Sequence, residues 1–131
     1  MTEAAVERAA EVLTPYCRAR DVLDRVGDKW SVYVITMLGE RTLRFSELKR
    51  NIHVITQRML TVTLRGLERD GLVERTVHPG YPARVDYALT PMGESLLDTM
   101  RALLTWSVEH VDEIDTARRH YDHTKPATTN P

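Results

Sequence analysis

Apolar residues recur at the three- and four-residue spacing of amphipathic helices along most of this chain. The spacing predicts a first helix over residues 3–13. Thr14-Pro15 has the pattern of an N-cap followed by proline at the first helical position, so we expect a second helix to begin there and to end at about Val26. Asp28 is placed to cap a third helix, which ends at Gly39.

The most informative pattern follows. Residues 46–52 form a short helix opened by Ser46, and Thr56 is placed to cap a longer helix over residues 57–70. With residues placed 100° apart, the longer helix has an apolar side and a basic side. The apolar side holds Leu60, Thr63, Leu64 and Leu67, and the other side holds Arg58, Thr61, Val62, Arg65 and Arg69. We therefore expect one face of this helix in the core and a basic face in solvent.

The pattern then changes to strands. Residues 73–77 and 84–89 alternate with the period of two that half-buried strands show, and residues 78–83 contain the Pro and Gly of a turn. They predict a two-stranded ribbon. Thr90-Pro91 repeats the cap-then-proline pattern and starts a long helix that runs to about Arg119.

The long helix carries a seam of the coiled-coil type, with one polar member, Ser107. One small domain has no obvious way to cover both flanks of such a helix, so a second copy of the chain is the natural partner. We expect the dimer interface to contain Leu97, Met100, Leu104, Val111 and Ile114. Residues 121–131 have no apolar pattern and are expected to be a disordered tail.

Composition limits the class of protein. A chain of 131 residues with 42% apolar residues fits one globular domain with helical extensions. It contains no apolar run approaching the length of a membrane span and no signal-peptide pattern, and its one cysteine excludes an internal disulfide. We therefore expect a cytoplasmic protein without a membrane partner.

Charge is distributed unevenly along the chain. Residues 41–84 contain nine Lys and Arg against four Asp and Glu, a net charge of +5, although the whole chain has a net charge of −1. A basic middle between acidic ends favours one surface that binds a polyanion.

Together these elements predict a mainly α fold with a small β-hairpin (α+β), a winged helix-turn-helix with N- and C-terminal dimerisation helices. We expect a helical extension over residues 1–15, the DNA-binding domain over 16–90 and a dimerisation helix over 91–120. The major groove of B-DNA, about 12 Å wide, admits one helix, and arginine is its commonest reader of guanine. Double-stranded DNA is therefore the expected partner, although winged helices also serve as protein-interaction modules.

Several motifs occur together over residues 16–115. They are Cys17, Gly27-Asp28-Lys29-Trp30, Arg44-Phe45-Ser46-Glu47-Leu48, Thr56 to Thr61, Leu64 to Val73, Pro82, Val85, Tyr87 to Thr90, and Gly93. With this set the chain resembles the HxlR-type branch of the MarR-like bacterial transcriptional regulators. The resemblance implies a homodimer that binds a palindromic operator and usually represses an adjacent gene. Gly66 inside the longer helix and the extension over residues 1–15 depart from the family pattern.

Carried onto this chain, the resemblance implies three groups of DNA contacts. The candidates for reading bases are Gln57, Arg58, Thr61 and Arg65, because glutamine suits adenine and arginine suits guanine. The candidates for phosphate contacts are Ser46, Lys49, Arg50 and Arg69. The candidates on the wing are Arg84 and, at its tip, Tyr81 and His78.

Cys17 is the one candidate for reactive chemistry. Counted from Thr14 as N-cap it lies in the first turn of a helix, where the helix dipole, Arg18 and Arg20 favour a thiolate. Several relatives in the family use a cysteine here to sense oxidants or electrophiles. The outlets are a disulfide to the partner subunit's Cys17, a mixed disulfide with a small thiol, or an electrophile adduct. The alternatives are an inert buried cysteine and a regulator that senses a small ligand in an apolar dimer cleft.

Other chemistry is less well supported. His120 and His123 have a spacing that suits a metal, but they lie where we expect the last helix to fray. No set of Ser, His and Asp has a context for nucleophilic catalysis. We therefore expect no metal, no cofactor and no enzymatic activity.

Overall fold

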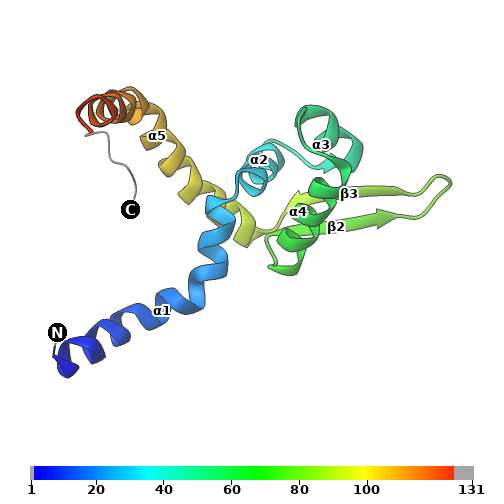
Figure 1. The fold of residues 1–131 in the computed structure, drawn as a ribbon. Coiled ribbons are helices and arrows are strands. Elements are labelled where there is room, and N and C mark those ends of the chain that lie inside the picture. The colour runs from blue at the N-terminus through cyan, green and yellow to red at the C-terminus, as the bar shows by residue number, and fades with distance from the viewer. Residues whose placement is uncertain (1, 126–131) are drawn as a thin grey trace. The chain divides into compact units, whose positions relative to one another are not determined.

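The computed structural model describes residues 2–125, apart from the side chains at positions 10 and 12–14. The chain forms two compact units, Met1–Leu97 and Asp98–Pro131. The elements, drawn in Figure 1, are α1 (Glu3–Gly27), α2 (Lys29–Leu38), β1 (Leu43–Arg44), α3 (Phe45–Asn51), α4 (Gln57–Arg69), β2 (Val73–His78), β3 (Arg84–Leu89) and α5 (Pro91–Thr124). Within the described part of the chain, no helix has both the length and the apolar character needed to cross a membrane.

A small antiparallel sheet joins the helices of the first unit. Its strand order is β1-β3-β2, with Leu43 opposite Tyr87 and Val73 opposite Leu89. The apolar residues of α2 and α4 are buried together with this sheet, and the β2–β3 hairpin projects beyond α3 and α4 (Figure 1). The predicted fold class, a mainly helical winged helix-turn-helix, is confirmed.

Local capping explains where these elements begin and end. The Asp28 Oδ2 atom accepts from the Ser31 backbone N–H at 3.2 Å, and the Thr56 hydroxyl accepts from Met59 N–H at 3.1 Å. The Thr90 hydroxyl accepts from Gly93 N–H at 3.0 Å and donates to the Gly71 carbonyl at 2.6 Å. It thereby joins the start of α5 to the turn after α4. These three predicted caps are confirmed.

The prediction of two helices before Gly27 was wrong. Glu3–Gly27 is one continuous helix, and Pro15 lies inside it. A Thr-Pro pair fits the start of a helix, because an interior proline costs one hydrogen bond and crowds the carbonyl four residues earlier. The helix nevertheless continues through Pro15. β1 was also missed, because two residues are too few to show a period.

The end of the chain differs too. α5 continues through Thr124, so residues 121–124 are helical and not part of a tail. Residues 126–131 lie outside the described residues.

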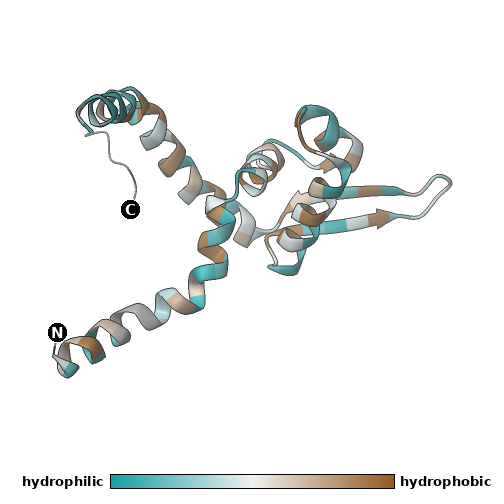
Figure 2. Cartoon of the chain, in the orientation of Figure 1, coloured by the Kyte–Doolittle hydropathy of each residue, from teal (hydrophilic) through white to brown (hydrophobic). Residues whose placement is uncertain are grey.

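The residues of the predicted seam on α5 differ in how far they are buried. Leu97 and Met100 are buried in the single chain, at 3% and 2% exposure, whereas Leu104 and Val111 are exposed and Ile114 is half-buried. Figure 2 shows apolar and hydrophilic positions interleaved along this helix. The part of the predicted interface that a partner can reach is therefore its C-terminal part.

Candidate nucleic-acid interface

Helix α4 has the two faces that the sequence predicts. Leu60, Thr63, Leu64 and Leu67 are buried, and Gln57, Arg58 and Arg65 are exposed. The alternation follows from the helical repeat, since the buried residues are three or four positions apart. The core thus holds the helix on one side and leaves a polar stripe in solvent on the other.

A groove of about 500 Å³ runs along this stripe. Gln57, Thr61 and Arg65 line it from α4, at steps of four residues, while Arg58 is exposed outside it. The Thr61 hydroxyl donates to the Gln57 carbonyl at 2.8 Å, which leaves its oxygen free to accept and its methyl group available for contact. The structure therefore brings three of the four predicted base readers together. The remaining lining consists of Phe45, Leu64, Glu68, Arg75 and Tyr87.

Arg75 on β2 and Glu68 on α4 are groove residues that the sequence reasoning missed as candidates. Arg75 pairs with Tyr87 of β3, which in turn pairs with Leu43, so Arg75 lies on the sheet face that Tyr87 helps to bury. The alternation of residues 73–77 already placed Arg75 on the same side as Val73. The charge of Arg75 alone did not show that this side of β2 lines the groove beside α4.

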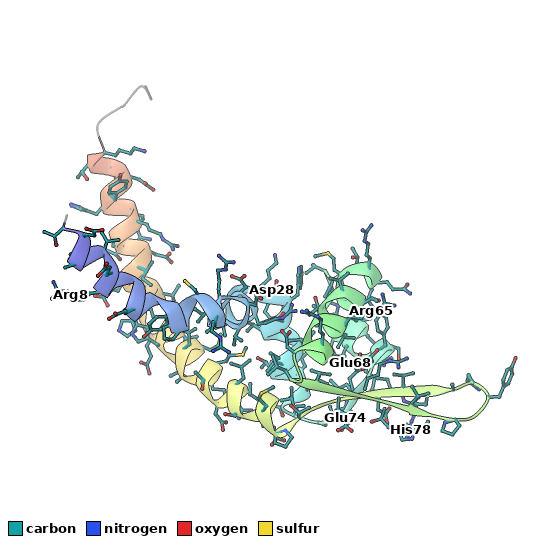
Figure 3. The ribbon with its side chains drawn as sticks, turned by 90° about the horizontal axis from the view of Figure 1, so that it is seen from below. Arg8, Asp28, Arg65, Glu68, Glu74 and His78 are labelled. Atoms are coloured by element: carbon teal, nitrogen blue, oxygen red, sulfur yellow. The ribbon has the colours of Figure 1, made fainter. Side chains whose placement is uncertain are left out.

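A second hollow, of about 390 Å³, lies between the start of α3 and the part of the hairpin next to its turn. It brings Ser46 together with Arg84, two residues predicted to contact DNA, and adds Arg44. The Arg84 Nη2 atom lies 3.5 Å from Asp86 Oδ2, and His78 Nε2 lies 2.9 Å from the same oxygen. In Figure 3, Glu74 and His78 project from the hairpin on the side opposite Arg65 and Glu68.

Helix α3 begins one residue before the predicted Ser46, at Phe45. The Arg44 backbone N–H donates to Glu47 Oε1 at 3.0 Å, and Arg41 Nη1 lies 3.4 Å from Glu47 Oε2. The pKa of the Glu47 carboxyl is held below its ordinary value, chiefly by the hydrogen bond from the Arg44 backbone N–H. Desolvation opposes this lowering, and the charges of nearby arginines add to it. Lys49 and Arg50 follow in the last turn of α3.

The remaining predicted contacts lie apart from the groove. Tyr81 is fully exposed in the turn between β2 and β3. Arg69, at the end of α4, lines a different hollow, together with Arg25 and the acidic residues Asp21, Asp24, Asp28 and Asp70. The structure therefore groups Arg69 with acidic side chains of α1 and the α1–α2 junction.

Cys17 is exposed and lies in the interior of α1. Because α1 is continuous from Glu3, Cys17 is not in a first helical turn, and the expected contribution of a helix N-terminus to its reactivity was wrong. Its position in an exposed helix also differs from the alternative of an inert buried cysteine.

His120 and His123 lie near the end of α5, with His123 in its last turn. In the part of the chain that the structure describes, no three His, Cys, Asp or Glu side chains are grouped as a metal site.

Comparison with known proteins gives a consistent result. The model of the HxlR-like helix-turn-helix family matches residues 25–115. An uncharacterised HTH-type transcriptional regulator of Methanothermobacter thermautotrophicus is 46% identical over 90 residues, which cover 69% of each chain. The redox regulator HypR in its reduced form is 34% identical with a TM-score of 0.70, covering 76% of this chain and 98% of its own. Diamide-treated YodB from B. subtilis is 30% identical with a TM-score of 0.64, covering 70% and 91%.

Proposed function

This chain belongs to the HxlR-like helix-turn-helix family of transcriptional regulators, and we propose that it acts as a homodimer on a palindromic DNA operator, as a repressor. The observation that carries the proposal is the groove in which Gln57, Thr61 and Arg65 of α4 meet Arg75 of β2. Amide, hydroxyl and guanidinium groups are the side-chain groups that read base edges in the major groove.

In this proposal α4 enters the major groove. Gln57 and Arg65 hydrogen-bond to bases, with glutamine suited to adenine and arginine to guanine. Thr61 contacts a base through its hydroxyl oxygen or a thymine through its methyl group. Arg58, exposed beside the groove, reads a base or binds the phosphate next to it.

The flanking residues position the protein. Ser46, Lys49 and Arg50 of α3 contact phosphates, and Arg44, in the same hollow as Ser46, adds a further cation. Arg84 reaches the adjacent minor groove from the start of β3, with His78 opposite it on β2 and Tyr81 at the tip as further contacts. Arg69 contributes to phosphate binding only through its field, because it lies among carboxylates at the other end of α4.

Exposed apolar surface on α5 supports dimerisation. Leu104, Val111, Trp106 and Val108 of α5 are all exposed in the single chain. A second copy that covers this surface presents two α4 helices about one DNA turn apart, roughly 34–36 Å.

We further propose that modification of Cys17 sets the affinity for the operator. Its exposure in α1 and the likeness to HypR, a redox regulator, and to YodB, solved after diamide treatment, support this. The modified forms are a disulfide to the partner subunit's Cys17, a mixed disulfide with a small thiol, and an electrophile adduct.

The experiment is fluorescence anisotropy on the duplex that wild-type protein selects from a random library. It is run at physiological salt with and without diamide or a quinone, beside Cys17→Ser. Binding that treatment abolishes in wild type but not in the variant is the expected result. If treatment leaves DNA binding unchanged, Cys17 does not act as a sensor, and the result favours a regulator that senses a reversible ligand.

Salt distinguishes DNA binding from a protein-interaction module. Six phosphate contacts imply a slope of about −5 in a plot of log affinity against log salt concentration. A chain that selects no duplex and shows no such slope is instead a module that binds a protein.

A further inference from the structure

The side chain of Arg25, near the end of α1, extends to α4 and binds a carboxylate at the end of that helix. Its Nε atom donates to Asp70 Oδ2 at 2.7 Å, and both side chains are about three-quarters buried, with 27% and 24% exposed. The guanidinium group occupies the space beside Gly66, where a Cβ atom would overlap it. A residue of α1 is thus locked onto α4 by a contact between positions 45 residues apart in the sequence.

Two residues of α4 that weaken the helix locally are both explained by Arg25. Gly66 lies inside the helix, where alanine or a longer side chain would favour helix formation. Asp70 is the C-cap, where a negative charge opposes the helix dipole. Gly66 provides the space for the guanidinium, and Asp70 provides its acceptor. Both residues disfavour the helix locally, but both fit the same tertiary contact with Arg25. This agreement indicates that the contact accounts for the presence of these two residues.

The charges around Arg25 also favour the contact between α1 and α4. Its hollow is lined by Asp21 and Asp24 of α1, Asp28 at the junction with α2, and Asp70 of α4. Arg69 is the other cation there. Asp28 already accepts from the Ser31 backbone and hydroxyl groups. Without Arg25, the carboxylates of α1 would face that of α4 with one cation between them, and the two helices would repel.

We propose that Arg25, Gly66 and Asp70 form a clamp that fixes the angle of α4 relative to α1 and thereby sets the half-site spacing that the dimer accepts. This inference rests on the proposed function. Arg25 is a positioning residue, because it acts on DNA recognition only through α4. Exposed apolar residues in the same half of α1, Tyr16, Val22 and Leu23, are available to a second copy, so α1 connects a dimer contact to the DNA-reading helix.

The geometry makes the spacing sensitive to the clamp. Helix α4 has 13 residues and is about 20 Å long. The clamp holds its C-terminal end, so a tilt of about 10° there moves the N-terminal end by about 3 Å. That displacement is close to one base-pair step, about 3.4 Å. A loosened clamp therefore lets each α4 helix reach half-sites that the wild-type dimer rejects.

The test measures spacing preference, which a purely structural contact leaves unchanged. The duplex selected by wild-type protein is compared with copies that carry one or two base pairs inserted at the dyad. We expect wild type to bind the inserted duplexes at least about tenfold more weakly. Arg25→Gln, Asp70→Asn and Gly66→Ala should bind the selected duplex more weakly than wild type and reduce the penalty for insertion to about threefold or less.

Matched controls exist in the same region. Asp24→Asn removes a carboxylate from the same hollow, and Gly27→Ala adds a methyl group where no atom lies within 4 Å. Both should keep the wild-type penalty. A penalty that survives unchanged in the three clamp variants, even with a lower melting temperature, overturns the proposal.

A second measurement separates this proposal from the proposed function. Spin labels are attached at Arg18→Cys in α1 and Arg58→Cys in α4, in a Cys17→Ser background diluted with unlabelled protein. The distance distribution should broaden with Asp70→Asn and stay narrow with Asp24→Asn. If wild type binds no duplex, the proposed function fails, and a broadened distribution still supports the clamp as a helix-positioning device. A distribution unchanged by Asp70→Asn overturns the clamp in either case.

Discussion

Gly93, in the first turn of α5, lies against the backbone carbonyl oxygen of Leu72 so closely that a Cβ atom at position 93 would overlap it. The Thr90 N–H also donates to that oxygen, at 3.1 Å. The glycine thus permits the close approach of α5 to the turn that ends α4. Leu72 immediately follows Gly71, whose φ of +76° is a conformation that favours glycine.

Gly93→Ala should therefore destabilise the fold by about 1–3 kcal/mol or more, since a backbone carbonyl has less freedom to move than a side chain. The measurement is the free energy of unfolding in urea. Gly27→Ala, with open space around the added methyl group, should be neutral or stabilising by up to about 1 kcal/mol. Equal stabilities of the two variants would show that the α5 contact is not tight.

Arg65→Ala should cost about 1–3 kcal/mol in operator binding and relax the preference at one base pair. The reason is that a guanidinium group in the groove pairs with one base. Anisotropy titrations against single-base operator variants measure this. Equal weakening on operator and random DNA would contradict a base-reading role.

Arg75→Ala should behave differently, because its position on β2 beyond α4 suits a phosphate. We expect similar weakening on operator and random DNA, and a salt slope smaller in magnitude by about 1. Titrations over a range of salt concentrations measure the slope. A change in base preference with no change in slope would make Arg75 a reader.

Glu68→Gln removes the negative charge from the groove. Affinity for random duplex should rise, because Glu68 repels phosphates, and discrimination between operator and random DNA should fall. The same substitution at Glu74, on the opposite sheet face (Figure 3), is the matched control and should change binding little. A loss of affinity for random duplex with Glu68→Gln would mean that its carboxylate helps to hold the DNA-binding surface together.

Glu47 gives a pH dependence. Its folded-state pKa is lowered from the ordinary value of 4.5, so its ionised form stabilises the fold above that pH and this contribution is lost as the pH falls through the folded-state pKa. Wild type should have a higher melting temperature than Glu47→Gln at neutral pH, and the difference should shrink below about pH 4.5. A difference that grows in acid would reverse the assignment.

The sequence by itself determined the elements whose signals are local. Asp28, Thr56 and Thr90 cap helices through hydrogen bonds to residues three positions later, so reading the chain in order finds them. The amphipathic pattern of α4 likewise depends on neighbours three and four residues away. Such signals specified the winged helix-turn-helix and most of its candidate DNA contacts.

Only the tertiary structure decided which residues meet across the chain. It placed Arg75 over the groove of α4, joined Ser46 to Arg84 and separated Arg69 from both. It also explained Gly66, because the space beside this glycine is filled by the Arg25 guanidinium, from a helix that ends 39 residues earlier. Contacts of this kind depend on how the helices pack, and no period or cap within one segment encodes the partner in another.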